Sequence, residues 1–181
     1  MSLIPRNSKS GRERMGKLGM ENIDFILFSH RQLGEMTCAS SAHEFIAKLH
    51  GKLAVEDFPL QSGEDAGKAG WDFDEFLRSI GFTGQPLELL PVEAIAVLSD
   101  ETENGRFPLV SVDEVRVGNQ IACHVLVAVP TVNGVGLVDP GRNEFRTKSS
   151  ENTLRELERS ASLAPRLSQI MKYTPIGSES L

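Results

Sequence analysis

Cys38 has the residue type and the sequence position of a nucleophile. Thr37 before it is a typical helix N-cap residue, and Gly51 closes the segment that follows. Apolar residues recur between them at helical spacing: Ala42, Phe45, Ile46 and Leu49. Cys38 is therefore expected in the first helical turn, where unpaired backbone N–H groups and the helix dipole favour an anion. A thiol there has a lowered pKa, as a nucleophile requires.

Considered alone, Cys38 fits better as a small apolar residue at a helix start, because most free cysteines are buried and unreactive. Two further residues favour chemistry. Gln32, six positions upstream, can aim a side-chain amide at the oxyanion formed when the Cys38 sulfur attacks a carbonyl. His124 interrupts the otherwise apolar segment 121–129 and must find a hydrogen-bond partner or lose about 1–3 kcal/mol. A hydrogen-bonded core histidine would also meet that need without catalysis.

Asp139 is the first candidate partner for His124, and the register of the hairpin between them decides whether it can reach. A two-residue turn at 133–134 would place His124 opposite Asn143. Asp139 would then lie four residues away along the strand, about 13 Å. A loop over 130–133 would instead place His124 directly opposite Asp139.

Pro130 selects between these registers, because a proline has no N–H to give to a paired strand and is favoured in a turn. The sequence therefore predicts the longer loop, with Asp139 orienting His124. Asn143 is kept as a reserve orienting residue.

The remaining pattern predicts an α+β fold, with helices packed on an antiparallel sheet that follows them in the chain. Helices are expected over 38–50, 72–80, from 91, and over 153–164, with Asp72 as an N-cap. Strands are expected over 23–28, 107–112, 121–129 and 135–139. Residues 1–20 are expected to form a flexible arm, residues 21–175 a single domain, and residues 176–181 a frayed tail.

Composition narrows the class of protein. The 181 residues are 40% apolar, typical of one globular domain, and a net charge of −6 disfavours a nucleic-acid surface. No segment has transmembrane length, and no signal for Sec-type secretion is seen. A cytoplasmic protein, or one exported by another route, is expected. The sequence does not indicate an oligomeric state.

No metal site is expected either. Cys38, His43 and Cys123 lack the paired spacing of a structural zinc site. His43 is expected on the polar side of the predicted helix, about 140° around it from Cys38. The two cysteines of the chain offer no disulfide framework.

Gln32, Cys38, His124 and Asp139 together resemble the papain-like cysteine peptidases, in which a glutamine stands six residues before a cysteine that opens a helix. The chain is most similar to the compact bacterial branch that includes bacteriocin-processing peptidase domains, over roughly residues 23–148. The resemblance implies a papain-like fold, a peptide or protein substrate, and no cofactor or metal. It also implies that Gln32 is the oxyanion donor, Cys38 the nucleophile, His124 the general base and acid, and Asp139 the orienting residue.

Other functions fit the same residues. Cys38, His124 and Asp139 would also suit a cell-wall amidase, an amide-modifying bacterial effector or an acyltransferase, although Gln32 favours the peptidases. A degenerate domain that binds peptides without cutting them is the non-enzymatic alternative. Ala39 favours that alternative slightly, because many members of the bacterial branch have Gly or Trp after the cysteine.

Overall fold

The computed structural model describes residues 22–34, 37–61, 73–163 and 167–177. A helix covers residues 22–29. The remaining elements follow in this order: α2 (Cys38–Leu49), η1 (Pro59–Gln61), α3 (Asp74–Ser79), β1 (Phe82–Leu89), α4 (Pro91–Glu103), β2 (Leu109–Val117), β3 (Gln120–Thr131), β4 (Gly134–Asp139), η4 (Pro140–Arg142), β5 (Glu144–Thr147), α5 (Ser150–Leu163) and β6 (Ser168–Pro175). The arm predicted for 1–20, the Asp72 cap and most of the predicted tail lie outside the described residues.

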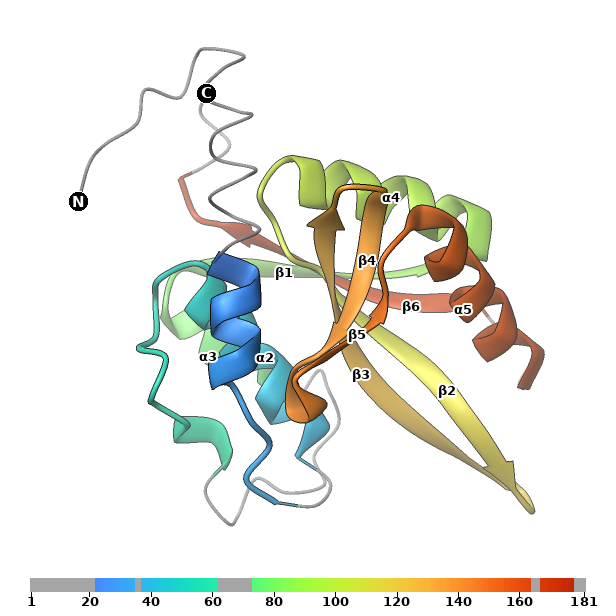
Figure 1. The fold of residues 1–181 in the computed structure, drawn as a ribbon, viewed down its shortest axis with the longest axis horizontal. Helices are drawn as coiled ribbons and strands as arrows, with labels where there is room; N and C mark the ends of the chain where they lie inside the picture. Colours follow the sequence, from blue (N-terminus) through green and yellow to red (C-terminus); the bar gives the residue numbers. More distant parts are fainter. Residues whose placement is uncertain (1–21, 35–36, 62–72, 164–166, 178–181) are drawn as a thin grey trace.

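The strands form one antiparallel sheet in the order β1-β6-β2-β3-β4-β5. Helices cover both faces: α2 and α3 lie on one side, and α4 and α5 lie on the other (Figure 1). The α+β class, with helices packed on an antiparallel sheet, is therefore confirmed.

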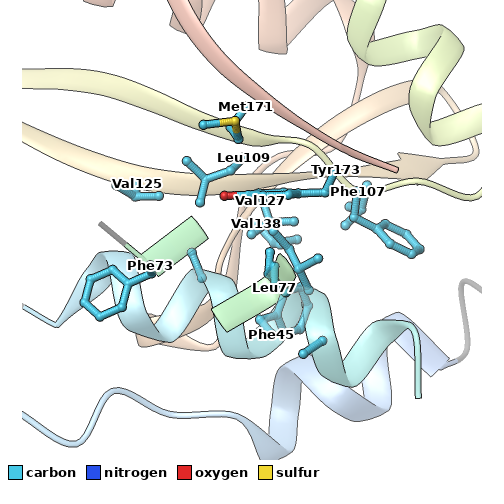
Figure 2. Packing of buried hydrophobic residues seen from close by; sticks show 14 of the residues in the cluster. Phe45, Phe73, Leu77, Phe107, Leu109, Val125, Val127, Val138, Met171 and Tyr173 are labelled. Carbon is cyan, nitrogen blue, oxygen red and sulfur yellow. The ribbon is translucent and has the colours of Figure 1, made fainter. Parts of the chain in front are cut away.

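Each face of the sheet has its own apolar core. Side chains from α2 and α3 meet those of the sheet in the first core, as Figure 2 shows for Phe45, Leu77, Val127 and others. The second core joins α4 and α5 to the opposite face: Ala94, Leu98, Val110, Val112, Leu126, Ala128, Val135, Leu137, Leu157 and Ile170. Residues of β3 alternate between the two cores, as the period of a strand requires.

The strand predicted over 23–28 is wrong, since these residues are helical. Ile23, Ile26 and Leu27 are buried, which is the i, i+3, i+4 spacing of a helix face. Three strands were not expected: β1, β5 and β6. β1 contains Pro86, a residue accepted there because β1 lies at the edge of the sheet.

The predicted hairpin register is also wrong. Thr131 pairs with Gly134, so the turn contains Val132 and Asn133 rather than residues 130–133. The shift of the partner strand is two residues, and side chains alternate faces with a period of two. His124 and Asp139 therefore stay on the same face of the sheet despite the different register.

Pro130 lies inside the paired strand, opposite Val135. Hydrogen-bonded and non-hydrogen-bonded pairs alternate in an antiparallel ladder, and a two-residue turn is closed by a hydrogen-bonded pair. Pro130 belongs to the next pair, which is not hydrogen bonded, so β4 needs no N–H from it. Pro130 also lies beyond the end of the pairing between β3 and its other neighbour, β2, which stops at Leu109 and Val127. Pro130 therefore occupies the paired strand without costing the ladder a hydrogen bond, contrary to its predicted place in the turn.

Candidate active site

Cys38 is the first residue of α2 and is partly buried. Thr37 occupies the N-cap position, but its hydroxyl does not cap the helix; it donates to the Gly34 carbonyl at 2.8 Å. The backbone N–H groups of Ala39 and Val125 instead interact with the Cys38 sulfur. The helix start thus presents its partial positive charge to this thiol, as its sequence position predicts.

His124 on β3 and Asp139 at the end of β4 form an ion pair, with His124 Nε2 at 2.6 Å from an Asp139 carboxylate oxygen. Extending the register places Asp139 opposite Leu126, two residues along β3 from His124. Diagonal neighbours on one face are within reach of long side chains. Asp139 is 1% exposed and His124 13% exposed, so water screens the pair little.

A short 3₁₀ helix fixes the Asp139 carboxylate from the other side. The Arg142 backbone N–H donates to Asp139 at 3.3 Å, as in an N-cap, and the Arg142 guanidinium lies 3.8 Å from the carboxylate. Arg142 was not predicted from the sequence as part of this site. The signal was present, because an aspartate followed by Pro140 is the signature of a capped helix start.

The Cys38 thiol lies close enough to the His124 ring for each group to shift the pKa of the other. Because Nε2 is bound to Asp139, Nδ1 is the nitrogen that remains for Cys38. The three side chains therefore interact in series, from the sulfur to the imidazole and from the imidazole to the carboxylate.

The electrostatics of this chain favour charge separation. Burial acts to raise the pKa of the Cys38 thiol, but hydrogen bonds from His124 and backbone N–H groups outweigh it and lower that pKa. Burial acts to lower the pKa of His124, but Asp139 and Cys38 raise it to about 9. Burial likewise acts to raise the pKa of Asp139, and His124 and Arg142 lower it. A thiolate beside an imidazolium is the state that these shifts stabilise.

Gln32 is half-buried in the loop before α2. Its side-chain Nε2 donates to the Gly34 carbonyl at 2.8 Å. Gly141 of η4 approaches so closely that a Cβ there would lie 2.3 Å from Gln32 Oε1. The Gln32 side chain therefore lies against the turn that follows Asp139.

Asn143, the reserve orienting residue, is placed elsewhere: its amide donates to the Leu27 carbonyl at 2.6 Å. Its left-handed backbone, with φ of 55°, suits an asparagine. In the structure His124 pairs with Asp139, and Asn143 links η4 to the helix over residues 22–29.

His43 is fully buried, so its expected place on the polar side of α2 is wrong. Its Nδ1 donates to the Ala39 carbonyl at 2.8 Å, and the Tyr173 hydroxyl donates to its Nε2 at 2.7 Å. Both ring nitrogens are satisfied, which is what allows a histidine to occupy a core position.

In the part of the chain that the structure describes, no helix is long and apolar enough to cross a membrane. The same residues contain no group of three or more histidine, cysteine or acidic side chains arranged to hold a metal ion.

Comparison with known proteins adds a distant structural likeness. No protein-family model matches the sequence, and no curated protein is significantly similar to it. The fold is similar to two solved structures of the Salmonella effector SpvD. The R161 variant has a TM-score of 0.48 at 11% sequence identity, covering 95% of this chain and 82% of that chain. The G161 variant has a TM-score of 0.46 at 12% identity, covering 95% and 81%.

Proposed function

We propose that this protein is a cysteine peptidase that transfers the acyl group of a peptide or isopeptide bond to Cys38 and then to water. The observation that carries the proposal is the His124–Asp139 ion pair at 2.6 Å, together with the electrostatic interaction between the Cys38 thiol and the His124 ring. The opposite pKa shifts of Cys38 and His124 support it, because a thiolate–imidazolium pair is the reactive form of such a nucleophile.

In the proposed reaction the Cys38 thiolate attacks the substrate carbonyl carbon and forms a carbon–sulfur bond, while an electron pair moves onto the carbonyl oxygen. The Gln32 amide and the Cys38 backbone N–H bind that oxyanion. Protonated His124 gives its proton to the leaving amine as the carbon–nitrogen bond breaks. His124 then takes a proton from water, which attacks the thioester and releases the acid.

The resemblance to papain-like peptidases supports a peptide or protein substrate, and the spacing of the site residues is similar to that of their compact bacterial branch. The same three steps also serve an amidase, an amide-modifying effector or an acyltransferase. These alternatives differ in substrate or acceptor and leave the roles of Cys38, His124 and Asp139 unchanged.

Alkylation by iodoacetamide tests the proposal without a known substrate. Cys123 is exposed and lies beside His124 in sequence, so it provides a comparison thiol within the same chain. Rates measured between pH 5 and 10 on Cys38→Ser and Cys123→Ser variants separate the two sulfurs. We expect the Cys38 thiol to react at pH values well below about 8.5, the ordinary pKa of a free thiol.

A Cys38 rate that follows an ordinary thiol titration would overturn the proposal and favour a non-catalytic peptide-binding domain. An activated Cys38 that hydrolyses no member of a peptide library would favour the amidase, effector or acyltransferase instead. Full hydrolysis by the Cys38→Ser variant would show that another residue is the nucleophile.

A further inference from the structure

The Gln61 side chain is hydrogen bonded to the backbone on both sides of Gln32, the proposed oxyanion donor. Its Oε1 accepts the Leu33 backbone N–H at 2.6 Å, and its Nε2 donates to the Arg31 carbonyl at 3.3 Å. One amide group therefore binds the backbone on both sides of Gln32, with one donor and one acceptor. Gln61 is 9% exposed, so few water molecules compete for these bonds.

Glu44 connects this amide to the helix that carries Cys38. Gln61 Nε2 lies 3.4 Å from one Glu44 carboxylate oxygen, and the other oxygen accepts the Leu60 backbone N–H at 3.1 Å. Glu44 belongs to α2 and has no exposed surface. The backbone around Gln32 is thus tied through η1 to the same rigid element as the nucleophile.

A second connection fixes the Gln32 side chain itself. The Gly34 carbonyl accepts both the Gln32 amide and the Thr37 hydroxyl, each at 2.8 Å. Thr37 immediately precedes Cys38. An amide nitrogen carries two hydrogens, so the bond to Gly34 orients the Gln32 amide and leaves its second N–H for a ligand.

We infer that Gln61 is a positioning residue, which holds Gln32 in register with Cys38 so that the Gln32 amide can bind the oxyanion. The inference rests on the proposed function. Only an amide side chain supplies the acceptor for Leu33 and the donors for Arg31 and Glu44 at once. A displacement of about 1 Å at such a donor can lower a rate by about 10²-fold.

Two reagents that react with Cys38 distinguish a misplaced oxyanion donor from a general disturbance of the site. Acylation of Cys38 by p-nitrophenyl acetate passes through a tetrahedral oxyanion and releases p-nitrophenolate. Alkylation by iodoacetamide displaces iodide directly and forms no oxyanion. The test uses the full chain carrying Cys123→Ser, so that Cys38 is the only thiol, with Gln61→Met as a variant of similar volume.

We expect Gln61→Met to lower the acylation rate on the order of tenfold while the alkylation rate and its pH profile stay unchanged. The same substitution in a Gln32→Ala background should have no further effect, because Gln61 acts through Gln32. Gln120→Ala, at an exposed glutamine in β3, is the matched control and should leave both rates unchanged. Gln61→Asn, which keeps a shorter amide, provides a second variant should Gln61→Met fail to fold.

Equal losses in acylation and alkylation, or additive losses with Gln32→Ala, would overturn the positioning role and leave Gln61 as a structural residue. An acylation rate that Gln61→Met leaves unchanged in the chain with native Gln32 would overturn it as well. If Cys38 with native Gln61 is neither activated nor acylated, the proposed function fails, and the positioning role fails with it.

Discussion

His124 lies between a thiol and a carboxylate, and both neighbours stabilise its protonated ring. This arrangement makes the residue sensitive to Asp139, whose charge is almost fully buried. The Asp139→Asn variant keeps the shape of the side chain but loses that charge. We expect the pKa of His124 to fall and the hydrolysis rate to drop by about 10²-fold or more.

Titration of the His124 ring by NMR, together with alkylation of Cys38 near pH 6, measures both effects. Arg142→Ala is the matched control, because its exposed guanidinium lies 3.8 Å from Asp139 while its backbone N–H donates the shorter bond. Asp139→Asn with an unchanged His124 titration would contradict the assigned electrostatics.

The pH dependence of the two reactions should differ above pH 9. Alkylation needs only the Cys38 thiolate, whose fraction stays high once the lowered pKa of the thiol is passed. Hydrolysis of a peptide amide also needs a proton on His124, and that proton is lost as the pH rises through about 9. We expect a plateau for alkylation and a bell-shaped profile for hydrolysis of a fluorogenic peptide library. Two profiles of the same shape would contradict this assignment.

At the scale of elements, η4 links Asp139 to Gln32. Asp139 caps this short helix, and Gly141 within it packs closely against the Gln32 side chain. A Cβ at Gly141 would lie 2.3 Å from Gln32 Oε1 and 3.1 Å from Gln32 Cβ. Since the first atom is the end of a flexible side chain, we expect Gly141→Ala to move Gln32 with little change in Tm. Acylation by p-nitrophenyl acetate should fall, while alkylation of Cys38 should stay unchanged.

The Gln32→Ala background supplies the control for Gly141→Ala. An alanine at position 32 removes the Oε1 that the added methyl group would meet at 2.3 Å and keeps only the Cβ at 3.1 Å, so the double variant should acylate at close to the rate of Gln32→Ala alone. A further loss in the double variant would show that Gly141 acts on another part of the site.

Local patterns in the sequence predict the elements of this site better than they predict how the elements pair. The α2 helix follows from its apolar spacing and begins at Cys38, as predicted. The histidine–aspartate pair formed although its register was predicted wrongly, because the error was an even number of residues. An odd error would have placed the two side chains on opposite faces.

Long-range pairing explains what the sequence could not predict. β1 and β6 lack strong strand patterns and are ordered by each other, with Phe82 opposite Pro175 and Leu89 opposite Ser168. His43 was predicted on the polar side of α2 from its angle of about 140° to Cys38. Its partner Tyr173 is distant in sequence and gave no local signal for burial. Gln61 gave no signal for the same reason, since its bonds reach back to the Gln32 loop. Such contacts depend on tertiary packing rather than on local propensity.

At the scale of the whole molecule, two buried histidines, His30 and His43, and the partly buried His50 should make the fold sensitive to acid. Burial lowers the pKa of His30 to about 3, and those of His43 and His50 to about 4. The unfolded chain binds protons at these rings below pH 6.5, where the native state does not, so stability falls as the pH drops from 6.5 towards 4. His124 acts in the opposite sense near pH 6.5, because its native pKa is about 9 and the unfolded ring gains its proton only as the pH falls through 6.5. Well below pH 6.5 it is protonated in both states and adds no slope.

Thermal unfolding at pH 7 and pH 5 measures this loss. We expect a lower Tm at pH 5, and a smaller difference in His50→Phe, where the ring already lies between Phe82 and Phe107. A Tm difference that His50→Phe leaves unchanged would mean that His50 is not among the titrating groups.

The order of strands in the sheet has a consequence for biosynthesis. β6 lies between β1 and β2, although it is the last of the described strands in chain order. A polypeptide emerging from a ribosome can form the β2–β3–β4–β5 part of the sheet first, but β1 must wait for β6 to be translated before it has a neighbour. Cys38, His124 and Asp139 all precede β6 in the chain, so the three residues of the candidate site are synthesised while this edge of the sheet still lacks its neighbour.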